Sequence, residues 1–120
     1  MRLNIFCATL DKEGDGPKII SSQFPSAEIE NKGIMPSAIL GGPASLKSEM
    51  KRYEGAAPYG GPSPAYLWVI RLPMSDGNIS SSHVYKICEE NQHKFIDMEV
   101  TISETPENEI TFYDGSARVF

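Results

Sequence analysis

Ala65-Tyr66-Leu67-Trp68-Val69-Ile70-Arg71-Leu72 is the most apolar segment of the chain, with apolar or aromatic residues at every position except Arg71. Pro73 follows the segment and ends the run. A short run of β-branched and aromatic residues that stops at a proline predicts a buried strand over residues 65–72. We therefore expect this strand in the core of a sheet, with Trp68 largely buried.

The N-terminal residues have the pattern of a second core strand. Residues 2–10 carry apolar side chains on both faces of an extended chain, which is typical of a strand inside a sheet. A Gly- and Asp-rich turn follows, and residues 18–24 are predicted to return as a short strand.

The C-terminal quarter predicts a hairpin. Residues 95–103 alternate regularly, with apolar residues at the even positions expected to face the core and Asp97 and Glu99 expected to face solvent. A turn with a proline at its favoured second position leads into a further strand over residues 109–113. One face of this hairpin is therefore predicted to be in water.

Residues 25–64 differ in amino-acid composition from the rest of the chain. The segment holds six of the nine prolines and six of the ten glycines, so we expect it to be mostly irregular. One helix is predicted inside it over residues 43–53, because Leu46, Met50 and Tyr53 recur at helical spacing. The residues expected on its water-facing side are Lys47, Lys51 and Arg52.

A second helix is predicted over residues 82–91. One of three preceding serines is suited to cap it, and Val84, Ile87 and Cys88 share one helical face. A strand over residues 82–90 remains the alternative. Together these elements predict a single α+β domain over residues 1–120 with a mainly antiparallel sheet.

Composition restricts the class of protein. The chain has 120 residues, of which 40% are hydrophobic and 22% charged, so we expect one soluble domain and no membrane partner. Cys7 and Cys88 have no Cys or His at metal-ligand spacing, and the sequence predicts a reduced, cytoplasmic chain without a cofactor. In an exported chain a Cys7–Cys88 disulfide stays an alternative.

The charge is unevenly distributed. Net charge is −5, and residues 89–120 contain two basic and eight acidic residues, whereas the rest of the chain is nearly neutral. This distribution disfavours nucleic acid, which is bound by clustered Lys and Arg, and fits a protein partner with a basic surface or plain solubility equally well.

Candidate catalytic residues are few. His83 and His93 are the only histidines, and each would need a partner for acid–base chemistry that sequence spacing does not supply. In the structural interpretation, His83 belongs to a helix entry and His93 to an exposed helix end.

Candidate binding residues lie in two places. Tyr53, Tyr59 and Tyr66 flank the Gly/Pro-rich residues 54–64, and aromatic residues on a stiffened loop are typical of recognition surfaces. The alternative is that these tyrosines fix the loop to the core. The C-terminal hairpin contributes the acidic residues Asp97, Glu99, Glu107 and Glu109, which would otherwise serve to discourage aggregation of a solvated sheet.

The resulting hypothesis is a small acidic protein-binding domain, such as an inhibitor or immunity-type protein that masks a basic target. The alternative is a small enzyme or ligand-binding domain with a pocket under residues 25–64, using His83 or His93.

Overall fold

The computed structural model describes residues 2–40, 45–53, 57–73, 80–103 and 109–115, with the backbone alone for 103 and 109–115. The strands are β1 (Arg2–Thr9), β2 (Glu28–Pro36), β3 (Pro64–Pro73), β4 (Asp97–Ser103) and β5 (Glu109–Gly115). The α-helices are α1 (Asp15–Ser22), α2 (Leu46–Tyr53) and α3 (Ser81–Glu90), and short 3₁₀ turns span Ser37–Ile39 and Gln92–Lys94.

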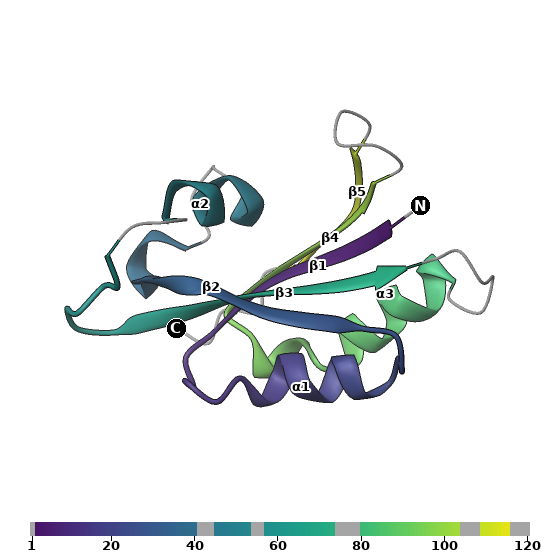
Figure 1. The fold of residues 1–120 in the computed structure, drawn as a ribbon, viewed down its shortest axis with the longest axis horizontal. Helices are drawn as coiled ribbons and strands as arrows, with labels where there is room; N and C mark the ends of the chain where they lie inside the picture. Colours follow the sequence, from purple (N-terminus) through teal and green to yellow (C-terminus); the bar gives the residue numbers. More distant parts are fainter. Residues whose placement is uncertain (1, 41–44, 54–56, 74–79, 104–108, 116–120) are drawn as a thin grey trace.

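Within these residues the five strands form one sheet in the order β2-β3-β1-β4-β5, and every neighbouring pair is antiparallel. Strands β1 and β2 therefore run parallel with β3 between them, and β3 and β4 run parallel with β1 between them. This is the split β-α-β arrangement of ferredoxin-like folds. Figure 1 shows α1 and α3 on one face of the sheet and α2 on the other. The α+β class predicted from the sequence is confirmed.

The two central strands are those with apolar residues on both faces. Ile5 of β1 lies opposite Ile70 of β3 and Val100 of β4, so the three strands share one apolar row. Trp68 is only 9% exposed, and its indole N–H donates to the Thr9 hydroxyl at 3.0 Å. The predicted core strand and the buried Trp68 are confirmed.

The segment after β1 is the helix α1, so the predicted short strand over residues 18–24 is wrong. The N–H of Asp15 donates to the Asp11 carboxylate at 2.9 Å, and Pro17 lies in the first turn, where no N–H is needed. Ile20 is fully buried, whereas its neighbour Ile19 is 37% exposed. One apolar residue of the pair thus faces the core, as in an amphipathic helix.

Residues 25–64 are more regular than the sequence predicts. The helix over residues 43–53 is confirmed from Leu46 onward, but the segment also contains β2, a strand of nine residues. The strand forms because its backbone pairs with the apolar β3 along its length. Gly33, at a φ of 134°, lies at an irregularity in this pairing rather than ending the strand.

Helix α3 confirms the predicted helix over residues 82–91, and the alternative strand over 82–90 is wrong. The Ser80 hydroxyl accepts a hydrogen bond from the His83 N–H at 3.2 Å and caps the helix.

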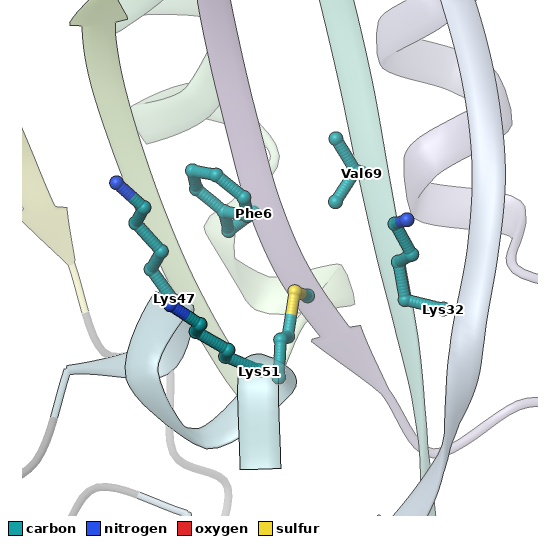
Figure 2. A pocket seen from close by; sticks show the side chains of 6 residues that line it. Phe6, Lys32, Lys47, Lys51 and Val69 are labelled. Atoms are coloured by element: carbon teal, nitrogen blue, oxygen red, sulfur yellow. The ribbon is translucent and has the colours of Figure 1, made fainter. Parts of the chain in front are cut away.

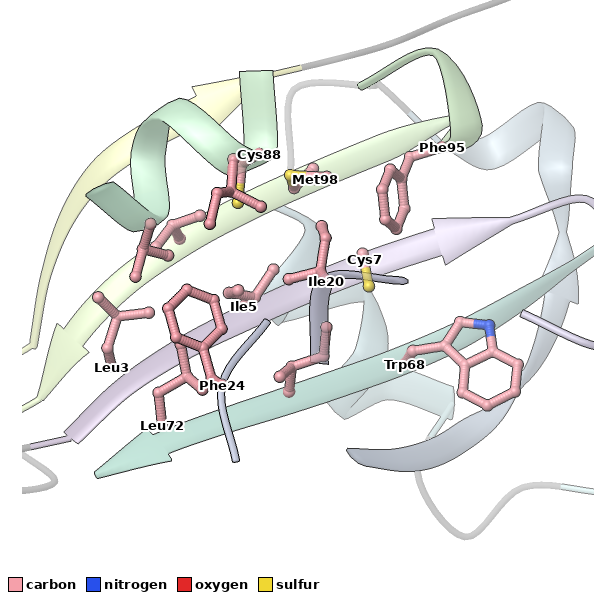
Figure 3. Close-up of a cluster of buried hydrophobic side chains, with 14 residues drawn as sticks. Leu3, Ile5, Cys7, Ile20, Phe24, Trp68, Leu72, Cys88, Phe95 and Met98 are labelled. Atoms are coloured by element: carbon pink, nitrogen blue, oxygen red, sulfur yellow. The ribbon is translucent and has the colours of Figure 1, made fainter. Parts of the chain in front are cut away.

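Two apolar clusters lie on the two faces of the sheet. The larger cluster, between the sheet and helices α1 and α3, is shown in Figure 3 and includes Leu3, Ile5, Cys7, Ile20, Phe24, Trp68, Leu72, Cys88, Phe95 and Met98. The smaller cluster, under α2, comprises Ala8, Met35, Leu40, Leu46, Met50, Ala65, Leu67, Val69 and Ile96. The sheet is thus apolar on both faces.

The second cluster corrects the predicted exposure of β4. Asp97 and Glu99 were expected in water, but they are only 7% and 4% exposed. They lie opposite Ala8 and Phe6, on the face that α2 partly covers, so the hairpin does not have the predicted solvated face there.

Candidate functional site

The three candidate tyrosines do not form one surface. Tyr53, at the end of α2, packs against the cluster under that helix, whereas Tyr66 packs against the cluster on the opposite face. The Tyr59 hydroxyl donates to the Pro62 carbonyl at 2.8 Å, which fixes the loop upon itself. Each tyrosine therefore has a structural role in the protein.

The two candidate acidic residues with described side chains, Asp97 and Glu99, do not form an exposed acidic surface. Asp97 accepts a hydrogen bond from the neighbouring Met98 N–H at 2.9 Å, and both Asp97 and Glu99 are buried. Glu107 lies outside the described residues, and only the backbone of Glu109 is described. Because Asp97 and Glu99 are buried, they cannot attract a basic partner at the protein surface. The protein-binding hypothesis is then supported only by the overall negative charge.

The histidines lie away from α2. The His83 ring, on α3, makes an edge contact with Phe24, with 5.9 Å between ring centres. His93 is exposed in the 3₁₀ turn that follows α3. The described residues contain no group of three or more His, Cys, Asp or Glu side chains suited to hold a metal ion.

The two thiols are poor nucleophiles. Burial raises the pKa of Cys88 to about 12, and burial, with a smaller contribution from the nearby Cys88, raises the pKa of Cys7. Because the thiolate is the reactive form, both cysteines stay protonated and inert at neutral pH.

The described residues form an open pocket of about 170 Å³ between α2 and the sheet. Its apolar side consists of Phe6 of β1, Val69 of β3 and Met50 of α2, and Phe6 and Val69 are direct neighbours across the two strands. The side chains are shown in Figure 2. Concave sites with apolar walls and a few polar groups are typical of ligand binding.

Three lysines surround this apolar floor. Lys32 comes from β2, and Lys47 and Lys51 come from successive turns of α2 (Figure 2). Like charges at this helical spacing repel each other, and Lys51 has no carboxylate partner among the described residues. A negatively charged group of a ligand would be attracted to the Lys51 ammonium. We call this site the lysine pocket, defined by Phe6, Lys32, Lys47, Met50, Lys51 and Val69.

An irregularity in β2 places Lys32 at the pocket. Asn31 is paired with Trp68 and Gly33 with the next residue, Leu67, so Lys32 is an extra residue in the strand. The Asn31 carboxamide oxygen accepts the Gly33 N–H at 2.9 Å and stabilises the bulge. Bulges of this kind redirect side chains and are frequent beside binding sites.

Lys32 also belongs to a small charge network. The Glu30 carboxylate contacts Arg71 at 2.8 Å and Lys32 at 3.3 Å. Hydrogen bonds from these two cations lower the pKa of Glu30. Because Glu30 is shared with Arg71 and half exposed, it neutralises the rim of the pocket only in part.

Comparison with protein-family models, curated proteins and solved structures gave no match. None of the helices in the described part of the chain is long and apolar enough to cross a bilayer.

Sequence reasoning found only part of the lysine pocket. Lys47 and Lys51 were expected to face water, and they are exposed on α2. Their meeting with Lys32 and Phe6 was missed, because it depends on how α2 is placed over the sheet. The only signal in the sequence was the spacing of two lysines by one helical turn.

Proposed function

We propose that this protein is a binding domain for a small anionic amphiphile, a molecule that joins an acidic group to an apolar body. The observation that carries the proposal is the lysine pocket, in which an apolar floor is surrounded by three ammonium groups. An apolar body resting on Phe6 and Val69 would be removed from water, and the acidic group would lie among the lysines.

The charge of the site supports an anionic ligand in an otherwise acidic protein. Net charge is −5, yet α2 carries three basic residues and one acidic residue. The acidic residue, Glu49, is buried and contacts Arg52 at 3.3 Å, so it is directed to a cation other than the two pocket lysines of the helix. Lys51 is therefore a cation of the pocket that the carboxylate of its own helix does not neutralise.

Binding rather than catalysis is the function that the site supports. The lining residues are Lys, Met, Phe and Val, and the two histidines and two thiols of the chain do not line it. General acid–base or nucleophilic chemistry needs a group poised to exchange a proton or attack near neutral pH. The lysine pocket offers charge and apolar surface instead.

The test uses 8-anilinonaphthalene-1-sulfonate, a fluorescent aromatic anion, as the first probe. Octanoate should displace the bound probe, whereas octyltrimethylammonium, with the same tail and the opposite charge, should not. Replacing Lys47→Gln together with Lys51→Gln should weaken octanoate binding by roughly three- to tenfold, the loss of about 1 kcal/mol.

A matched control isolates the position of the charges. Lys18→Gln with Lys86→Gln also removes two positive charges, but from exposed sites on α1 and α3, on the opposite side of the sheet. This control should bind octanoate like the parent. Equal weakening in both double variants, or equal displacement by the cationic amphiphile, would contradict the proposal.

A further inference from the structure

A second pocket adjoins the lysine pocket. It has a volume of about 200 Å³ and lies between β2, the end of α2 and the chain at residues 57–58. Lys32 lines both pockets, and the remaining walls of the second include Asn31, Tyr53 and Ala57. The two pockets therefore follow one another along the seam between α2 and β2, with Lys32 between them.

The two pockets differ in chemistry. The first has an apolar floor, whereas the second combines the polar side chains of Asn31 and Lys32 with apolar ones and borders the edge strand β2. Its apolar side chains are those of Ile34, Tyr53, Ala57 and Pro58. The Asn31 carboxamide oxygen is used by the Gly33 N–H, which leaves its NH₂ group as a donor. Along the outer edge of β2, alternate backbone groups also point away from β3. The second pocket is suited to a head group that accepts and donates hydrogen bonds.

We infer that the two pockets form one bipartite site for an amphiphile whose single negative charge lies in its middle, between an apolar tail and a hydroxylated head. The tail would occupy the lysine pocket, the charge would lie at Lys32, and the head would fill the second pocket. A phosphodiester with one alkyl and one hydroxylated substituent has this order of groups. The inference rests on the proposed function and adds to it the arrangement of the ligand.

Two probes with equal charge and equal tail test the second pocket. Octyl methyl phosphate and octyl glyceryl phosphate are both monoanions, and they differ only in the head group. Their affinities are measured by displacement of 8-anilinonaphthalene-1-sulfonate from the parent protein. The glyceryl compound should bind roughly three- to tenfold more tightly, the effect of one or two additional hydrogen bonds.

Filling the second pocket should remove this preference. Ala57→Trp places a large side chain at an exposed position that lines only the second pocket, so it should reduce the affinity ratio to about one without weakening octyl methyl phosphate. Ala38→Trp adds the same side chain at an exposed position outside both pockets and should keep the ratio.

A second variant guards against misfolding of the first. Asn31→Asp keeps the oxygen that accepts the Gly33 N–H but removes the NH₂ donor. Its added charge weakens both probes alike, so the ratio of the two affinities still reports the head group. A ratio near one in the parent, or an unchanged ratio in both Ala57→Trp and Asn31→Asp, overturns the bipartite site.

Failure of this inference is distinct from failure of the proposed function. If the head group adds nothing but both phosphates still bind in a manner that requires Lys47 and Lys51, the lysine pocket stands alone. If neither phosphate displaces the fluorescent probe, the proposed function falls, and the bipartite site with it.

Discussion

Buried thiols should make the protein sensitive to alkali. Burial raises the pKa of Cys88 from 9.0 to about 12, so the folded protein holds this proton more tightly than the unfolded chain. The resulting stability is fully present below pH 9 and is lost as pH rises towards 12. The complete loss corresponds to about 4 kcal/mol, and about 1 kcal/mol of it should already be lost at pH 10.

The assay is urea unfolding at pH 7.5 and pH 10 with a reducing agent present, for the parent and for Cys88→Ala. The variant loses a buried sulfur and should be less stable than the parent at pH 7.5. Its further loss between the two pH values should be smaller than that of the parent by about 1 kcal/mol, because one buried thiol no longer ionises. Tyrosines and lysines titrate in both proteins, so the difference reports Cys88 together with its smaller effect on the pKa of Cys7.

The outcome that refutes the reasoning is an equal loss of stability in both proteins. A second measurement checks the same premise: a thiol reagent at pH 8 should modify both cysteines in urea and neither in native buffer. Rapid modification of the folded protein would mean that Cys7 and Cys88 are accessible, contrary to their full burial.

Three further predictions concern the turn before α1, β4 and the pocket rim. Gly14→Ala should destabilise the protein by about 1–3 kcal/mol in urea unfolding, since Gly14 has a φ of 68° and an added Cβ would lie 2.5 Å from the Trp68 ring. Asp97→Lys with Glu99→Lys should abolish the folded far-ultraviolet circular dichroism spectrum, because both side chains are buried and two ammonium groups would take their place. Glu30→Gln should tighten binding of octyl methyl phosphate severalfold in the displacement assay, with little change in the urea midpoint, because an exposed countercharge is removed from the rim; weaker binding would contradict the position assigned to the ligand's charge.

The central sheet could be predicted because its signal is local. Residues 65–72 and 2–10 are apolar on both faces, and only a strand covered on both sides uses such a pattern. The strands β3 and β1 accordingly lie in the middle of the sheet, with a cluster on either face. Here the sequence pattern and the tertiary structure require the same arrangement.

The burial of Asp97 and Glu99 could not be predicted from the same kind of pattern. The alternation of apolar and polar residues in β4 correctly predicts that Asp97 and Glu99 face away from α1 and α3. It does not predict which element covers the other face of the sheet. That depends on the connection between β2 and β3, which is distant in sequence from β4.

The prediction that residues 25–64 are mostly irregular failed for a different reason. Glycine and proline were interpreted as breakers, yet Gly33 lies at a bulge inside β2, and Pro36 and Pro64 lie opposite each other at the end of the β2–β3 pair. Glycine and proline therefore mark the ends and irregularities of secondary-structure elements. Whether a strand forms between them is decided by pairing with β3.

The lysine pocket combines these local and distant effects. The bulge adds one residue to β2, so that Lys32 and Met35 can both face α2 although their separation in sequence is odd. Without the extra residue, a strand that buries Met35 would turn Lys32 towards the α1 side. The same bulge that lets β2 contribute to the core under α2 thus also brings a third positive charge to the two on the helix, and the proposed binding of an anionic ligand rests on that arrangement.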